Sequence, residues 1–191
     1  MTKIHKPILG TIKEVLDADT RVVACWLEGS IARGEDDDFS DIDLWIAVKE
    51  RSFQDFIDDR EQFAAQLGTV VSVLYPKTLG QNDAIDSFQI LLEDQPASLT
   101  VDVDVQKASR KFHFTKDSAA EECEVIFDKA NIIKYKAFNP QAVEEYVGDL
   151  FEDTVPRFWH RLPKVKVHLQ RGDLLESVDS YKDRLDDLVT L

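Results

Sequence analysis

The 191-residue sequence predicts an α+β fold, and three features of the chain lead to that prediction. Apolar residues recur at helical spacing near the N-terminus and again between residues 53 and 67. Short apolar segments bounded by turn residues alternate with these helices, as is typical of strands. From Asn139 onward the pattern is helical. With 43% apolar residues available for a core, we expect one domain of residues 1–138 followed by a helical region of residues 139–191.

The first elements expected are a helix and two strands. The helix is indicated by apolar residues that share one face, namely Ile4, Ile8, Leu9, Ile12, Val15 and Leu16. The apolar run Arg21–Glu28 predicts a buried strand that ends at a Gly29-Ser30 turn, where a short helical turn begins. After the acidic loop Glu35–Asp38, the segment Asp41–Val48 predicts the second strand.

A covering helix and further strands follow. The helix is indicated by Phe53, Phe56, Ile57, Phe63, Ala64 and Leu67, and Gly68 ends it. Thr69–Tyr75, stopped by Pro76, predicts a strand, and Phe88–Leu92 and Leu99–Gln106 predict two more. The weaker candidates are Phe112–Thr115 and Cys123–Asp128.

The helical region should begin at Asn139-Pro140, because Asn is a good N-cap and Pro suits the first helical position. Breaks are expected near Pro156, Pro163 and Gly172. An apolar stripe of Leu174, Val178, Tyr181, Leu185 and Leu188 runs to the end without a stop signal. Either this last helix packs against a partner, such as a second copy of the chain, or the natural protein continues.

Composition narrows the class of protein. The chain has 37 acidic and 23 basic residues, a formal net charge of −14, which repels nucleic acid and favours cationic partners. Its two cysteines do not suggest a disulfide scaffold or a metal site. The sequence shows no signal peptide and no apolar run that could span a bilayer. We therefore expect a cytoplasmic protein that binds neither membrane nor nucleic acid.

Two short segments each carry a pair of aspartates in a strand pattern. Asp41 and Asp43 project to one face of their strand, and Asp102 and Asp104 alternate with three valines in another. If these strands are neighbours, the carboxylates converge, and such a site favours a bound Mg²⁺. Either pair alone is more often a solvated strand surface, whereas both pairs together with the preceding Gly-Ser turn favour a functional site.

Two segments resemble the DNA polymerase β-like nucleotidyltransferase superfamily. They are Gly29-Ser30-Ile31-Ala32-Arg33-Gly34 and Ser40-Asp41-Ile42-Asp43-Leu44. The closest branch is the small-molecule antibiotic adenylyltransferases, of the aminoglycoside, lincosamide and streptomycin types. Phe158-Trp159 and Arg171-Gly172-Asp173-Leu174 resemble the helical region of the streptomycin type. The resemblance implies a nucleotidyltransferase fold, a mixed β-sheet flanked by helices and followed by a helical region that covers substrate or nucleotide.

The resemblance also implies roles for individual residues. Gly29 and Ser30 would hold the nucleotide phosphates, and Asp41 and Asp43 would bind Mg²⁺, with two ions expected. A third carboxylate would complete the site and help to deprotonate the acceptor hydroxyl. Asp102 is the first choice for this metal-binding acid, and Asp104 the second.

Basic residues suited to the triphosphate are few. No acid interrupts the stretch from residue 157 to residue 171, which contains Arg157, Arg161, Lys164, Lys166 and Arg171. We expect Lys164 and Lys166 to bind the nucleotide, although a helix face that pairs with acidic loops would give the same pattern. Arg33 could approach phosphate too, or be an ordinary surface arginine.

The function expected is Mg²⁺-dependent transfer of AMP from ATP to a hydroxyl of a small molecule, with release of pyrophosphate. The acidic loop and the net charge would suit a cationic acceptor such as an aminoglycoside, although a loop that only keeps the protein soluble would look the same. Two alternatives remain open. One is an antitoxin-like or non-catalytic nucleotide-binding module on the same fold, and the other is an enzyme that adenylylates a protein.

Overall fold

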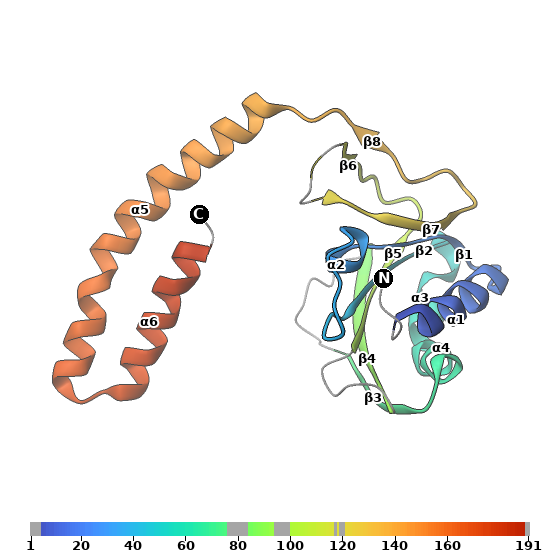
Figure 1. The fold of residues 1–191 in the computed structure, drawn as a ribbon, viewed down its shortest axis with the longest axis horizontal. Coiled ribbons are helices and arrows are strands. Elements are labelled where there is room, and N and C mark those ends of the chain that lie inside the picture. Colours follow the sequence, from blue (N-terminus) through green and yellow to red (C-terminus); the bar gives the residue numbers. More distant parts are fainter. Residues whose placement is uncertain (1–4, 76–83, 94–99, 117, 119–120, 190–191) are drawn as a thin grey trace. The chain divides into compact units, whose positions relative to one another are not determined.

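The computed structural model describes residues 5–75, 84–93, 100–116, 118 and 121–189, so Ile4, Pro76 and Leu99 lie outside the described residues. The chain divides into two compact units, Met1–Phe138 and Asn139–Leu191. The first unit contains a six-stranded sheet with helices, and the second contains two long helices (Figure 1).

The large sheet has the strand order β3-β4-β5-β2-β1-β7. Its strands are β1 (Val22–Leu27), β2 (Ile42–Val48), β3 (Val70–Leu74), β4 (Ile85–Leu92), β5 (Thr100–Lys107) and β7 (Glu124–Asp128). The pair β2–β5 is parallel and the other pairs are antiparallel, so the sheet is mixed. The predicted fold class, a mixed sheet flanked by helices and followed by a helical region, is confirmed.

Most predicted strands form within a few residues of their expected positions. The strand β4 begins three residues before the predicted Phe88, at Ile85. A second, small sheet pairs β6 (Phe114–Thr115) with β8 (Tyr135–Lys136), and the sequence had not indicated β8. Its two residues are too few to show the alternation on which strand prediction depends.

The helices of the first unit cover one face of the sheet. The covering helices are α1 (His5–Ala18), α3 (Phe53–Asp58) and α4 (Arg60–Leu67) (Figure 1). The unit also contains the short α2 (Gly29–Ala32) and the 3-10 turn η1 (Glu50–Ser52). The predicted covering helix is thus divided at Asp59. The core beneath these helices includes Ile12, Leu16, Leu27, Leu44, Ile46, Phe56, Val103 and Val105, all nearly inaccessible to solvent.

The opposite face of the sheet is polar at one end and aromatic in the middle. Side chains of β2 and β5 alternate, so the valines of β5 enter the core while Asp102 and Asp104 point to this second face. Trp26, Trp45, Phe112 and Phe114 form part of a smaller apolar cluster there, separate from the core that α1, α3 and α4 cover. The second face is therefore the one that can present functional side chains.

The second unit consists of α5 (Pro140–Arg171) and α6 (Leu174–Val189), which pack against each other. The side chain of Asn139 caps α5 by accepting a hydrogen bond from the Ala142 amide, and Gly172 ends the helix at a φ of 78°. The breaks expected at Pro156 and Pro163 are wrong, because α5 continues through both residues and bows instead (Figure 1). Each proline removes only one backbone donor, and packing against α6 supports the helix that remains.

The apolar stripe predicted on α6 is largely exposed in the structure. Leu174, Val178 and Tyr181 are more than half exposed, while Ser177 and Arg184 are buried. Among the described residues, no helix is both long and apolar enough to cross a membrane.

Candidate active site

The parallel pairing of β2 with β5 brings the predicted acids together on the second face of the sheet. Asp43 lies opposite Asp102, and Trp45 lies opposite Asp104. Asp41 immediately precedes β2 and is half-buried, as are the other three aspartates. The two acidic segments are therefore neighbours, as a shared site requires.

Strand pairing extends these positions into two rows across the sheet. The first row contains Gln89, Asp102, Asp43 and Glu28, because Gln89 pairs with Asp102 and the Glu28 amide donates to the Asp43 carbonyl at 3.1 Å. The second row begins with Ser87, whose hydroxyl donates to the Asp104 carboxylate. It continues through Asp104 and Trp45 to Trp26. The acids thus face a common surface from three adjacent strands.

Burial raises the pKa of these carboxyl groups, and neighbouring carboxylates raise the pKa of Asp43 and Asp102 further. Burial raises the pKa of Asp43, the charges of Asp41, Asp102 and Asp104 raise it further, and Arg33 opposes them. For Asp102, burial and Asp41 raise the pKa against hydrogen bonds from Gln89 and Thr100. Burial likewise raises the pKa of Asp104, against the hydrogen bond from Ser87. The site therefore concentrates more negative charge than its own residues neutralise.

Gly29 stands directly beside the acid pair. Its φ is +67°, a left-handed conformation that favours glycine, and a Cβ on this residue would lie 1.9 Å from Oδ2 of Asp43. Ser30 follows in α2, where its carbonyl accepts from the Glu35 amide at 2.9 Å. The Gly-Ser turn consequently keeps open the space that the Asp43 carboxylate occupies.

The basic residues predicted for the site lie in two different parts of the chain: Arg33 is in the first unit, and Lys164 and Lys166 are in the second. Arg33 forms an ion pair with Glu35, with 2.8 Å between Nε and Oε2, and its charge also acts on Asp43. Lys164 and Lys166 are exposed on α5, in the other unit. Their part in nucleotide binding stays a prediction.

Glu28 is an acid of this surface that sequence reasoning missed. It is half-buried, and its Oε1 accepts a hydrogen bond of 2.9 Å from the Trp26 indole. Burial raises the pKa of Glu28, and so do the charges of Asp104 and Asp43, while Trp26 and Arg110 oppose them. The available signal was its position directly before Gly29, but only the pairing of β1 with β2 places it beside Asp43.

The loop before Asp41 is held by a buried histidine that the sequence had not singled out. Nε2 of His5 lies 2.9 Å from the Ser40 carbonyl, and its Nδ1 lies 3.3 Å from the Asp36 carboxylate. Both side chains are almost completely buried. The acidic loop is therefore not solvated throughout, because Asp36 turns inward and ties it to α1.

The donor set suits a hard divalent cation. Within the described residues, no group of three or more His, Cys, Asp or Glu side chains forms a ready-made metal site. Asp41, Asp43 and Asp102 nevertheless offer carboxylate oxygens, which Mg²⁺ prefers, and the missing side chain of Gly29 leaves space for the Asp43 carboxylate. The residues present fit Mg²⁺ as a guest.

The chain is similar to a known protein family. The family model described as streptomycin adenylyltransferase matches residues 2–189, almost the whole chain. No curated protein matches it. The match spans both units and confirms the resemblance to antibiotic nucleotidyltransferases that the sequence motifs indicated.

Proposed function

Because the chain belongs to the streptomycin adenylyltransferase family and is a nucleotidyltransferase, we propose that it transfers AMP from ATP to a hydroxyl of a cationic antibiotic. The observation that carries this proposal is the position of Asp43 opposite Asp102, with Gly29 against the Asp43 carboxylate. Acids from two strands beside a Gly-Ser turn provide donors for a cation and for phosphate in one place. Family membership makes a non-catalytic module a weaker alternative.

Asp41, Asp43 and Asp102 are the residues that would hold Mg²⁺, and we expect two ions. When bound, the metal supplies positive charge that stabilises the oxygens of the triphosphate and of the attacking hydroxyl. Burial and, to a lesser extent, neighbouring carboxylates raise the pKa of Asp43 and Asp102, and a bound cation would offset both effects, which supports this assignment.

Asp102 is the better candidate than Asp104 for the third carboxylate. It faces Asp43 directly, whereas Asp104 faces Trp45 and accepts a hydrogen bond from Ser87. We expect Asp102 to accept the proton of the acceptor hydroxyl while the oxygen bonds to the α-phosphorus and pyrophosphate departs. Asp104 would keep the neighbouring surface negative.

The triphosphate requires partners of its own. We expect the Gly29-Ser30 turn to contact it through backbone amides and the Ser30 hydroxyl, and Arg33 to approach it from α2. The charge of Arg33 counteracts the rise in the pKa of Asp43, so it reaches the acid pair beside which the phosphates would lie, which supports this role.

The acceptor is expected to be cationic. The net charge of −14 attracts cations at long range, and the acids beside Gly29 add a local negative potential. The family description names streptomycin, an aminoglycoside that carries guanidinium groups, and we propose an acceptor of this type.

The test is acceptor-dependent release of pyrophosphate from ATP. Streptomycin, other aminoglycosides, a lincosamide and a neutral disaccharide would be compared with Mg²⁺ and after addition of EDTA. We expect release with an aminoglycoside only, abolished by EDTA, together with an acceptor whose mass increases by one adenylyl group. Release with none of these, but with a protein that becomes labelled by AMP, would replace this proposal with protein adenylylation.

A further inference from the structure

A pocket of about 230 Å³ opens on the same face of the sheet as the acids. Its walls include Trp26 and Trp45, which are paired across β1 and β2, together with Phe112 and Phe114. Glu28 also lines it, and the Glu28 amide is bonded to Asp43. The pocket is therefore continuous with the acidic surface through adjacent positions of the same strands.

The aromatic rings of the pocket form a stack. The rings of Trp26 and Trp45 lie 5.7 Å apart at 11°, and those of Trp26 and Phe112 lie 5.3 Å apart at 16°. Phe114 meets Trp26 edge-on, at 83°. Trp26 is buried, whereas Trp45 and Phe112 are half-buried and retain accessible surface. The faces of aromatic rings attract cations that lie within about 6 Å of the ring centre.

A guanidinium group already lies against these rings. Cζ of Arg110 is 5.8 Å from the ring centre of Trp45 and 5.7 Å from that of Phe112. The Arg110 side chain is tethered at its other contact, where Nη1 donates to Oε1 of Gln106 at 2.6 Å. This contact demonstrates that the rings accept a flat cation.

The charge of the pocket selects among possible occupants. The Trp26 indole holds the Glu28 carboxylate at the pocket wall, and Asp104 stands beside Trp45 in the neighbouring strand. A triphosphate would be repelled by these acids. Arg110 offsets part of the charge of Glu28 from within the same pocket. An adenine base could stack on the rings but would form no ion pair with Glu28, whereas an ammonium or guanidinium group in the place of Arg110 would contact the rings and pair with Glu28.

We propose that this pocket is the acceptor subsite, in which a cationic group of the antibiotic lies against Trp45 and Phe112 with Glu28 as its counter-charge. This inference rests on the proposed function, since it names the pocket in which the acceptor of that reaction binds. A molecule anchored there has the acidic row of Asp43 and Asp102 next to it, so its hydroxyl can lie beside these carboxylates. Glu28 is then a specificity residue and takes no part in proton transfer.

Binding of streptomycin to the full chain, measured by calorimetry without ATP or metal, tests the subsite. Glu28→Gln keeps the shape and the acceptor oxygen but removes the charge, and we expect about tenfold weaker binding. The matched control is Glu14→Gln, which removes the same charge from an exposed position on α1, against the other face of the sheet. Equal weakening in both variants, or none in Glu28→Gln, overturns the inference.

Two further variants separate a cationic occupant from a nucleotide. Trp45→Leu should weaken streptomycin binding severalfold, whereas Arg110→Met removes the competing guanidinium and should strengthen it. The opposite sign for Arg110→Met would mean that the pocket receives phosphate. An increase in the KM for ATP in Glu28→Gln, with the KM for the antibiotic unchanged, would assign the pocket to adenine and also reject the acceptor subsite.

Steady-state kinetics distinguish this inference from the proposed function. The expected pattern for Glu28→Gln is a KM for the antibiotic raised about tenfold, with kcat and the KM for ATP unchanged. If the wild type binds the aminoglycosides with this dependence on Glu28 but transfers no AMP, the proposed reaction fails and the subsite stands. If AMP is transferred with equal efficiency by wild type and Glu28→Gln, only the subsite fails. If no aminoglycoside binds, the subsite is rejected.

Discussion

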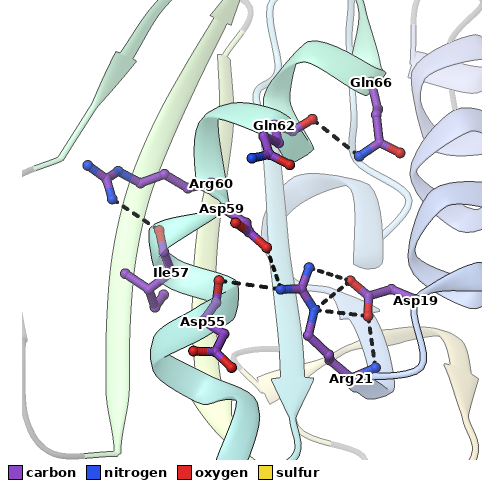
Figure 2. Close-up of polar contacts among 8 residues, drawn as sticks. All are labelled: Asp19, Arg21, Asp55, Ile57, Asp59, Arg60, Gln62 and Gln66. Atoms are coloured by element: carbon purple, nitrogen blue, oxygen red, sulfur yellow. Dashed lines mark hydrogen bonds and ion pairs between the residues drawn. The ribbon is translucent and has the colours of Figure 1, made fainter.

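Two groups of acids in the first unit differ in how their charge is balanced. Asp19 and Asp59 converge on Arg21, with ion-pair distances of 2.9 and 2.6 Å, beside the helices that cover the sheet (Figure 2). The pKa of Asp19 is lowered, because the hydrogen bonds and charge of Arg21 outweigh the effect of burial, with a further contribution from Lys129. The pKa values of Asp43, Asp102 and Asp104 are raised.

The first group has its cation built into the chain. In the second group, Arg33 acts on Asp43 but is also paired with Glu35. Balanced charge is what a structural cluster requires. Unbalanced charge at the half-buried edge of two strands is what the proposed cation site would require a ligand to offset. The two groups should therefore respond differently to the loss of a single carboxylate.

The largest difference is expected from neutralising one acid in each group. Asp43→Asn should lower kcat for AMP transfer by about 10³-fold, because it removes a proposed metal ligand. Asp59→Asn, which breaks an ion pair to Arg21, should keep near wild-type kcat in the folded protein. Pyrophosphate release under saturating substrates is the measurement. Comparable losses in both variants would remove the functional distinction between the groups.

A second comparison lies within the acidic surface. We expect Asp102→Asn to reduce kcat by about 10²-fold or more, since it would lose proton acceptance and metal binding. Asp104→Asn should reduce it less than about tenfold, because Asp104 faces Trp45 and is bonded by Ser87. The reverse order would make Asp104 the third carboxylate.

Gly29→Ala tests whether the space beside Asp43 matters. The new Cβ would lie 1.9 Å from Oδ2 of Asp43, so the carboxylate would have to turn away. Displacing a reacting group by about 1 Å can cost up to about 10²-fold in rate, and we expect a loss in that range. Gly34→Ala is the matched control, because Gly34 also has a positive φ but no atom within 4 Å of the added Cβ. A loss in the control as large as in Gly29→Ala would assign the effect to backbone strain.

Much of this arrangement follows from local sequence patterns. The alternation in Asp41–Val48 and Val101–Val105 reveals both strands and the face that their aspartates share. That the two strands are neighbours was a condition that the sequence could state but not establish, because strand order depends on contacts between distant residues. The pairing in register of Asp43 with Asp102 satisfies that condition.

The structural features that the sequence did not predict depend on contacts between residues far apart in the chain. Glu28 joins the acidic row only through the pairing of β1 with β2. His5 meets Asp36 across 31 positions, and Arg21 meets Asp59 across 38. Single residues with ordinary local surroundings carry no periodic signal, so neither contact could be predicted. The breaks predicted at the prolines of α5 were wrong for the opposite reason. There the local signal was strong, but tertiary packing overrode it.

The balanced group should matter for stability instead of activity. Arg21→Met leaves Asp19 and Asp59 without their shared counter-charge and should lower the free energy of unfolding by about 1–2 kcal/mol. Partial exposure of all three side chains, between 20% and 41%, keeps the effect modest. The control is Arg51→Met, at an exposed position of η1. Urea denaturation measures both, and an equal effect in the two variants would show that the Arg21 network adds nothing specific.

The smallest expected effect is on Tm, which should change in opposite directions when one acid of each group is neutralised. A folded-state pKa above the ordinary value of 3.8 means that the contribution of Asp43 to stability is present at low pH and is lost as the pH rises through the raised pKa. Asp43→Asn should therefore raise Tm by about 1–3 °C at pH 7 and lose this gain below pH 3.8. For Asp19, whose pKa is lowered, stability is present above its ordinary value, so Asp19→Asn should lower Tm at pH 7.

Addition of Mg²⁺ with ATP sharpens this difference. A cation that binds the carboxylates relieves their repulsion, so ligand should raise the Tm of the wild type and leave that of Asp43→Asn nearly unchanged. Asp19→Asn should respond to ligand as the wild type does, because its cluster already contains a cation. If Mg²⁺ with ATP raises the Tm of Asp43→Asn as much as that of the wild type, the raised pKa of Asp43 reflects burial alone and not a site prepared for a metal ion.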